Sequence, residues 1–269
     1  MKIVYHDVDG CLNADASTPI PIGGEPLPLN QSAKLRELGR KLDASSIDYL
    51  VINTGRSMED TLAIARDINS PKLRYIIAEH GAEYHDMKND KLVELQGSIG
   101  GKLDVIRNFI AWYRETGADI LNKRIGATVP VLDKGANLTL DARNGLDSEK
   151  VHIELKALVK HDSPFDDDQL VFHHSKADGF VDAMGQINKG DGIQVVSALL
   201  AGSQSAAEAV TSIAIGNGLN DMPMLEVASI PVCPANAEPE VREYCRSHGG
   251  VASTYEFIDA TLHWLEDQT

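Results

Sequence analysis

The sequence is poor in cysteine and in positive charge. Only three cysteines occur among 269 residues, Cys11, Cys233 and Cys245, and no two of them have the C-x-x-C spacing. This argues against a disulfide framework and against a zinc site, so we expect buried or half-buried thiols in a reducing compartment. Lysine and arginine number 25 against 40 aspartate and glutamate residues, which gives a formal net charge of −15. That charge repels nucleic acid and anionic membrane surfaces, so neither is an expected partner.

Long apolar runs are also missing. No stretch reaches the roughly 18 to 20 apolar residues that a membrane helix needs. Asp7 and Asp9 interrupt the N-terminal apolar residues, which is unlike a signal peptide. We therefore expect a soluble cytoplasmic protein. Its hydrophobic fraction of 43% and charged fraction of 24% are typical of a globular chain, without internal repeats or low-complexity tracts.

Short apolar segments alternate with helical patterns near both ends of the chain. Strands are predicted at residues 3–5, 49–52, 75–78 and 212–215, and helices at 31–42, 58–68, 192–200, 221–227 and 254–265. Ser57 followed by Asp60 resembles a capping box at the start of the second of these helices. Alternation of strands with helices predicts a parallel α/β sheet.

The middle of the chain follows another pattern. Helices are predicted at 103–115 and 151–159, a half-exposed strand at 137–142, and short strands around 171–172 and 180–181. Strands with one polar face and helices on the other indicate an α+β layer. The predicted fold class is therefore α/β, with a Rossmann-like parallel-sheet core at residues 1–84 and 186–269. An α+β cap domain is inserted at residues 85–185.

Two carboxylates directly follow the first predicted strand, in Asp7-Val8-Asp9-Gly10. Ligands bind beyond the carboxyl ends of strands in open parallel sheets, and an ionised aspartate there can attack phosphorus. A second carboxyl group can protonate the leaving oxygen and then activate water. A calcium loop with this spacing would need Glu where the chain has Ala16, which leaves a solvated turn as the ordinary alternative.

Three further segments lie at strand ends or helix starts. Thr54 follows the second strand, Lys189 precedes a helix, and Asp221 ends the segment Gly216-Asn217-Gly218-Leu219-Asn220-Asp221. A hydroxyl can hold phosphoryl oxygens, a lysine can neutralise the transferring group, and carboxylate or amide oxygens suit Mg²⁺. Taken alone, each has a plain alternative: a turn hydroxyl, a surface lysine, a glycine-rich turn.

In combination these segments resemble the motifs of haloacid dehalogenase superfamily phosphatases. The matching residues are Asp7-Val8-Asp9-Gly10, Thr54-Gly55-Arg56, Lys189-Gly190, and the run from Gly216 to Leu225. The inserted domain resembles the type C2 cap of that superfamily, and its α+β character the C2B subtype, as in Cof-type and sugar-phosphate phosphatases. The resemblance implies a magnesium-dependent phosphatase that hydrolyses a small phosphomonoester through an aspartyl-phosphate. A sugar phosphate or a glycosyl-glycerate phosphate is the first expectation.

The resemblance also implies a role for each matching residue. Asp7 would be the nucleophile and a Mg²⁺ ligand, and Asp9 the general acid and base whose backbone carbonyl also binds Mg²⁺. Thr54 and Lys189 would hold the phosphoryl group. The remaining candidates are Gly55 and Arg56 for substrate binding, and Asn217 and Asp221 for the metal.

The sequence departs from the superfamily at Asn217, where Asp is usual. The amide removes one negative charge, so weaker metal binding or a larger role for Asp221 is expected. Two alternatives to a phosphatase stay open: a phosphomutase, and a catalytically impaired module that binds a phosphosugar. In the cap, adjacent His173 and His174 would face opposite ways on a strand, and Lys176 is one of several cations that could meet a sugar. The sequence gives no oligomeric state.

Overall fold

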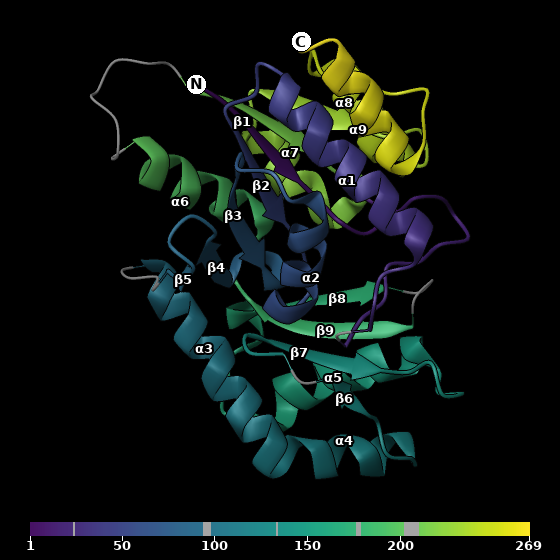
Figure 1. The fold of residues 1–269 in the computed structure, drawn as a ribbon. Coiled ribbons are helices and arrows are strands. Elements are labelled where there is room, and N and C mark those ends of the chain that lie inside the picture. Colours follow the sequence, from purple (N-terminus) through teal and green to yellow (C-terminus); the bar gives the residue numbers. More distant parts are fainter. Residues whose placement is uncertain (24, 94–97, 133, 176–178, 202–209) are drawn as a thin grey trace. The chain divides into compact units, whose positions relative to one another are not determined.

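The computed structural model describes residues 1–23, 25–93, 98–132, 134–175, 179–201 and 210–269 (Figure 1). The chain forms two compact units, one of Met1–Val93 with Asn188–Thr269 and the other of Glu94–Ile187. The inserted unit thus begins later than the predicted residue 85. The reason is that β4 (Glu83–Asp86) and β5 (Lys91–Leu92) pair antiparallel with the first unit's sheet.

Within the described residues the first unit has an eight-stranded sheet in the order β12-β11-β10-β1-β2-β3-β4-β5. All neighbours from β12 to β3 run parallel. This confirms the predicted α/β class with a parallel-sheet core. The strands not yet given are β1 (Lys2–His6), β2 (Tyr49–Asn53), β3 (Leu73–Ala78), β10 (Thr211–Ile215), β11 (Ile230–Cys233) and β12 (Val251–Ala252).

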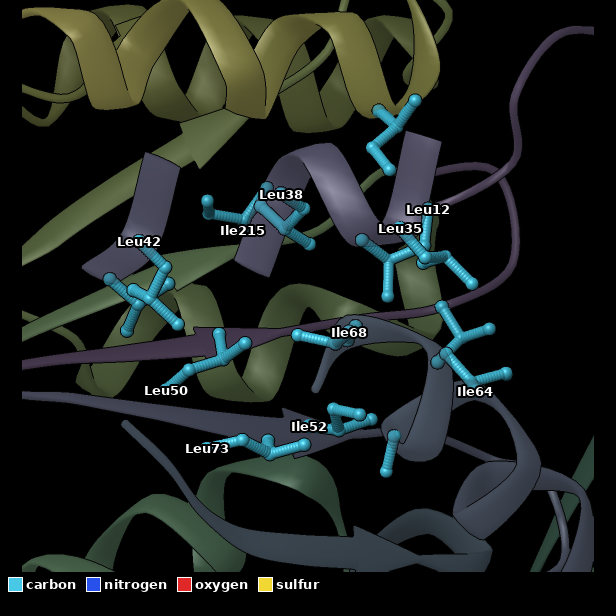
Figure 2. Packing of buried hydrophobic residues seen from close by; sticks show 14 of the residues in the cluster. Leu12, Leu35, Leu38, Leu42, Leu50, Ile52, Ile64, Ile68, Leu73 and Ile215 are labelled. Carbon is cyan, nitrogen blue, oxygen red and sulfur yellow. The ribbon is translucent and has the colours of Figure 1, made fainter. Parts of the chain in front are cut away.

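One face of this sheet is covered by α1 (Leu29–Ala44), α2 (Met58–Ile68) and α9 (Phe257–Glu266). Figure 2 shows leucines of α1 packed against α2 and the strands. The spacing of Leu35, Leu38 and Leu42 puts all three on one face of α1, and each is at most 1% exposed. Burial of such a side chain stabilises the fold by about 1.5–3 kcal/mol. This core holds the strands whose ends carry the candidate site.

Helix α6 (Lys189–Ala201) packs against the opposite face, together with α7 (Met222–Val227). The buried Tyr5 of β1 bonds to Ser197 Oγ at 2.8 Å and donates to the Ile193 carbonyl at 3.3 Å. Gly192 lies against Ile77 of β3. These contacts fix the start of α6, and with it Lys189, near the ends of β1 and β2. Helix α8 (Pro239–Ser247) packs on β11 and β12.

The second unit holds a four-stranded antiparallel sheet in its described part, in the order β6-β7-β9-β8. The strands are β6 (Val131–Leu132), β7 (Asn137–Asp141), β8 (Leu170–Ser175) and β9 (Phe180–Gly185). The helices are α3 (Ser98–Trp112), α4 (Ala118–Ile125) and α5 (Ser148–Asp162). Tyr113–Gly117 forms a π turn, so the helix predicted at 103–115 starts earlier and changes hydrogen-bond pattern at Tyr113.

Two expectations from composition can be compared with the structure. Cys11, Cys233 and Cys245 are buried and free, as predicted. In the described residues, the helices are too short or too polar to cross a membrane.

Candidate active site

The predicted catalytic segments meet at one edge of the core sheet. Strands β10, β1 and β2 are neighbours and run parallel, so their carboxyl ends lie together. Asp7 follows β1, Thr54 follows β2, and the segment from Gly216 to Asp221 follows β10. The Asp7 amide donates to the Ile215 carbonyl at 2.9 Å, which ties the first loop to the last.

A buried lysine joins two of these loops. The Lys189 ammonium group lies 2.6 Å from Asp7 Oδ1 and 2.5 Å from Asp221 Oδ1. All three residues are buried: Lys189 is 1% exposed, Asp7 4% and Asp221 0%. Two carboxylates and one ammonium group leave a net charge of −1 in a place that water barely reaches. We call these three residues the ion triad.

The excess negative charge acts on Asp7. The pKa of Asp7 is raised to about 7: burial is the largest cause, the Asp221 charge adds to it, and Lys189 opposes both. The pKa of Lys189 moves above its usual range, because its two carboxylate partners outweigh the effect of burial. The triad therefore keeps a charged lysine and lacks one compensating positive charge beside Asp7.

Asp221 has a second function in the loop after β10. Its Oδ2 accepts hydrogen bonds from the amides of Asn217 at 2.8 Å and Gly218 at 3.0 Å. Both of its carboxylate oxygens are thus engaged with protein donors. The geometry makes Asp221 the residue that shapes this loop and orients Lys189.

Asn217 lies against the loop after β1. Its Oδ1 accepts a hydrogen bond from the Cys11 thiol at 3.3 Å. A Cβ atom at Gly10 would come within 2.3 Å of the Asn217 amide nitrogen, and Gly10 has a φ of +77°. Glycine is therefore required at position 10 for two reasons: its positive φ and the close approach of the Asn217 side chain.

Thr54 is fully buried at the end of β2. Its amide donates to Ile77 at 2.9 Å, and its Oγ1 accepts from the Arg56 amide at 3.2 Å. The preceding Asn53 donates through Nδ2 to the Lys189 carbonyl at 2.9 Å. The ends of β2 and α6 are thereby connected, and Thr54 lies where the predicted site expects it.

Asp9 and Arg56 form a bidentate ion pair. Arg56 Nε lies 2.8 Å from Asp9 Oδ2, and one terminal nitrogen lies 2.6 Å from Oδ1. The same guanidinium group donates to the carbonyls of Ile20 at 2.7 Å and Pro21 at 2.5 Å. Arg56 is 8% exposed, whereas the Asp9 side chain is 58% exposed. In this arrangement Arg56 contacts the proposed acid, and Asp9 must leave Arg56 before it can carry a proton to a substrate.

Gly55 makes room for a neighbouring histidine. A Cβ atom there would lie 2.3 Å from His80 Nε2. His80 donates its amide to the Thr54 carbonyl at 2.9 Å and has a φ of 59°. Glu79, with a φ of 48°, donates its amide to the Arg56 carbonyl at 2.9 Å. Two successive non-glycine residues in the left-handed region store strain directly behind the Thr54 loop.

His6 connects the nucleophile loop to the last helix. Burial lowers the pKa of this fully buried histidine to about 4, so it is neutral. Its Nδ1 lies 2.5 Å from the Asp7 carbonyl, which can only accept, so Nδ1 carries the proton. Nε2 then accepts from the Thr261 hydroxyl at 2.7 Å. No local pattern in the sequence links His6 to Thr261, because the two residues are 255 positions apart.

Two amides hold the turn at Gly10. Asn13 Oδ1 accepts from the Gly10 amide at 2.7 Å, and Asn236 Nδ2 donates to the Gly10 carbonyl at 2.8 Å. Asn236 also accepts from the Phe257 amide at 2.8 Å. No local pattern in the sequence marks Asn236, because its partners come from distant segments.

The donor set suits a hard divalent cation. Asp7, the backbone carbonyl of Asp9 and the Asn217 side chain offer oxygen ligands of the kind that Mg²⁺ prefers. Burial first and the Asp221 charge second raise the pKa of Asp7, so a cation held there would favour its ionised form. Asp221 is less available, since Lys189 and two backbone amides occupy its oxygens. The residues therefore fit Mg²⁺, with one acid fewer than an all-aspartate site would supply.

The remaining candidates lie in the second unit. His173 pairs in register with Asp182 and His174 with Val181, so the two histidines do face opposite sides of the sheet. His174 stacks on His152 of α5. Lys176 lies outside the described residues.

Comparisons with known proteins agree with the motifs. Residues 132–254 match the sequence model of a family described as haloacid dehalogenase-like hydrolase. No curated protein sequence matches the chain.

Solved structures with the same fold cover nearly the whole chain. A Thermoplasma acidophilum protein has a TM-score of 0.64 at 15% identity, over 99% of this chain and 97% of its own. The sucrose-phosphatase of Synechocystis, solved with sucrose and phosphate, has a TM-score of 0.61 at 17% identity over 98% and 96%. A Bacteroides thetaiotaomicron phosphatase of the haloalkanoate superfamily has a TM-score of 0.59 at 19% identity over 99% and 94%. These structures confirm the predicted fold, and the family match over residues 132–254 agrees with the resemblance.

Proposed function

We propose that this chain is a haloacid dehalogenase-like hydrolase and acts as a magnesium-dependent phosphatase on a small phosphomonoester. The observation that carries the proposal is the ion triad, in which a buried lysine bonds both Asp7 and Asp221 at the end of β1. A buried lysine at this position lowers the repulsion that two carboxylates would exert on an approaching phosphate.

The first step is attack on phosphorus by Asp7. Lys189 is bonded to Oδ1, so Oδ2 is the attacking oxygen. A bond forms between Oδ2 and phosphorus while the bond to the ester oxygen breaks, which gives an aspartyl-phosphate. The leaving oxygen takes a proton from Asp9 after that side chain has left Arg56. Thr54 and Lys189 hold the phosphoryl oxygens.

The second step is hydrolysis of the aspartyl-phosphate. Asp9, now deprotonated, accepts a proton from water as the water oxygen attacks phosphorus, and Asp7 is released with inorganic phosphate. A Mg²⁺ ion held by Asp7, the Asp9 carbonyl and Asn217 would supply the positive charge that the ion triad lacks. His6 and Asn53 act at a distance by fixing the loops that carry Asp7 and Lys189.

We further propose that residues 94–187 form the cap that selects the substrate, and that the substrate is a sugar phosphate or a glycosyl-glycerate phosphate. The likeness of fold to a sucrose-phosphatase supports the first of these.

The test is phosphate release from a panel of sugar phosphates and simple phosphomonoesters, with Mg²⁺ and with EDTA. Asp7→Asn keeps the size of the side chain and removes the nucleophile, so we expect turnover to fall at least ~10³-fold. Steady release of inorganic phosphate separates a phosphatase from a phosphomutase, which would retain the phosphoryl group. Unchanged turnover in Asp7→Asn would refute the mechanism.

One observation favours a second candidate, a phosphosugar-binding module of reduced activity. Asn217 provides an amide where the superfamily usually has a carboxylate, which removes one negative charge from the metal site. Binding of sugar phosphates by folded, Mg²⁺-loaded protein without any turnover would support this candidate.

A further inference from the structure

The turn after Asp7 is built around a glycine that restrains its own backbone little. Gly10 has a φ of +77°, in a region that glycine reaches easily. It joins two peptide units, one with the Asp9 carbonyl and the Gly10 amide, the other with the Gly10 carbonyl and the Cys11 amide. Rotation at Gly10 turns one unit against the other. The direction of the Asp9 carbonyl, a proposed Mg²⁺ ligand, therefore depends on what holds these two units.

A side-chain amide holds each of the two peptide units. Asn13 Oδ1 accepts from the Gly10 amide at 2.7 Å, and Asn236 Nδ2 donates to the Gly10 carbonyl at 2.8 Å. In the described residues no peptide bond is cis, and the N–H and C=O groups of a planar trans peptide point in opposite directions. Because Asn13 binds the N–H of the first unit, it directs the Asp9 carbonyl away from itself.

The orientation of the Asn236 amide follows from its two partners. Its Oδ1 accepts from the Phe257 amide at 2.8 Å, which can only donate, whereas the Gly10 carbonyl can only accept. Nδ2 therefore faces Gly10, and the start of α9 fixes the side chain in that position. The Cys11 amide donates to the Val8 carbonyl at 3.1 Å, which holds the same peptide unit from its other end.

The segment that carries Asn236 also contacts the loop after β10. The Glu238 amide donates to the Asn217 carbonyl at 2.8 Å, and Glu238 Oε1 accepts from the Leu219 amide at 3.2 Å. The Asn217 side chain itself lies against Gly10. One short stretch between β11 and α8 is thus bonded to both loops from which the proposed Mg²⁺ ligands come.

We propose that Asn13 and Asn236, here called the amide clamp, are positioning residues that set the affinity for Mg²⁺ by fixing the direction of the Asp9 carbonyl. Neither side chain has to touch the ion or the substrate. Mg²⁺ demands near-ideal octahedral geometry, and a ligand that is already directed has no ordering cost on binding. The inference rests on the proposed function, which makes the Asp9 carbonyl a ligand.

The test makes the same substitution, asparagine to aspartate, at both residues of the clamp. A carboxylate can only accept hydrogen bonds. Asn13→Asp keeps the acceptor for the Gly10 amide. Asn236→Asp keeps the acceptor for the Phe257 amide but replaces the donor to the Gly10 carbonyl by a second acceptor, which repels it. Each change adds one negative charge beside the same turn. We expect the dissociation constant for Mg²⁺ to rise about tenfold in Asn236→Asp, and to stay equal or fall in Asn13→Asp.

Binding is measured through the melting temperature of the full chain, in EDTA and at increasing Mg²⁺ concentrations. An ion that binds the folded state stabilises it by an amount that its concentration and its dissociation constant set, so the readout does not depend on turnover. The value in EDTA reports structural damage separately. Asn236→Ala removes the donor without adding charge, should also weaken Mg²⁺ binding, and takes the place of Asn236→Asp if that variant does not fold.

The outcomes separate the inference from the proposed function. Equal Mg²⁺ affinity in wild type and Asn236→Asp would overturn the inference, even with a lower melting temperature in EDTA, because the clamp would then serve stability alone. Tighter binding in both aspartate variants would show that added charge sets the affinity. Equally weaker binding in both would show that any change at the turn disturbs the site. If Mg²⁺ does not stabilise the wild type, the metal site of the proposed function fails, and the inference with it.

Discussion

The core site and the inserted sheet differ in their buried polar groups: the core pairs its charges, although Asn53 Oδ1 and Tyr84 Oη also lack partners in the described structure. In the core, Lys189 bonds Asp7 and Asp221, and Arg56 bonds Asp9 with both donors of its fork. In β7 of the inserted sheet, Asn137 has a buried side-chain nitrogen without a partner in the described structure. Removal of one member of a buried ion pair leaves the other charge without compensation, whereas a buried neutral donor without a partner already costs stability. Removal of one charge from the core pairs should therefore lower the stability of the protein. Replacement of Asn137 by an apolar residue of similar size should raise it.

The largest effect is expected from Lys189→Met. The substitution leaves two buried carboxylates side by side without their cation, and breaking a buried ion pair in this way costs about 3–5 kcal/mol. Urea unfolding in EDTA measures the loss. Lys34→Met is the matched control, because Lys34 pairs with Asp259 while about a third of its side chain stays exposed. Exposed pairs contribute at most about 1 kcal/mol. Equal losses of unfolding free energy in the two variants would therefore contradict the view that Lys189 stabilises the core by pairing with buried carboxylates.

A smaller effect is expected from Asn217→Asp, which adds a third acid beside Asp7 and Asp221. Without metal the added charge should lower the melting temperature, because it increases the repulsion that already raises the pKa of Asp7. With Mg²⁺ the sign should reverse, and affinity for the ion should rise about tenfold, or ~1.4 kcal/mol.

Asn220→Asp is the matched control for that experiment. It makes the same change of charge in the same loop, at a residue outside the proposed ligand set. An equal gain in Mg²⁺ affinity would show that general charge, rather than ligation at Asn217, sets the affinity.

Much of the core site could be predicted because it depends on local order along the chain. Apolar strands followed at once by Asp7, Thr54 and Gly216 place these residues at one edge of any parallel sheet. Lys189 was different, since only the resemblance to a superfamily distinguished it from a surface lysine. Its burial between two carboxylates is a consequence of the packing of α6 on the sheet.

Other features depend on tertiary pairing that no local pattern records. The predicted boundary at residue 85 differs from the division after Val93 in the structure. The reason is that β4 (Glu83–Asp86) has a mixed sequence and joins the core sheet through antiparallel hydrogen bonds to β3. Alternation of polar and apolar residues predicted a half-exposed strand at 137–142, whereas β7 is buried along its whole length. The alternation could not show that Asp182 and His173 stand beside Thr139, because that depends on the register of three strands.

The smallest predicted effect lies behind the ion triad, where His6 links Asp7 to Thr261. Thr261→Val keeps the shape of the side chain and leaves the buried Nε2 of His6 without a donor, which should cost about 1 kcal/mol of stability. The hydrogen bond from His6 to the Asp7 carbonyl is then less well fixed, so kcat should fall several-fold while KM stays near that of the wild type. Thr261→Ser retains the hydroxyl and should recover both properties. If Thr261→Val lowers the urea midpoint and leaves kcat intact, the hydrogen bond between His6 and Thr261 stabilises α9 but does not support Asp7 in catalysis.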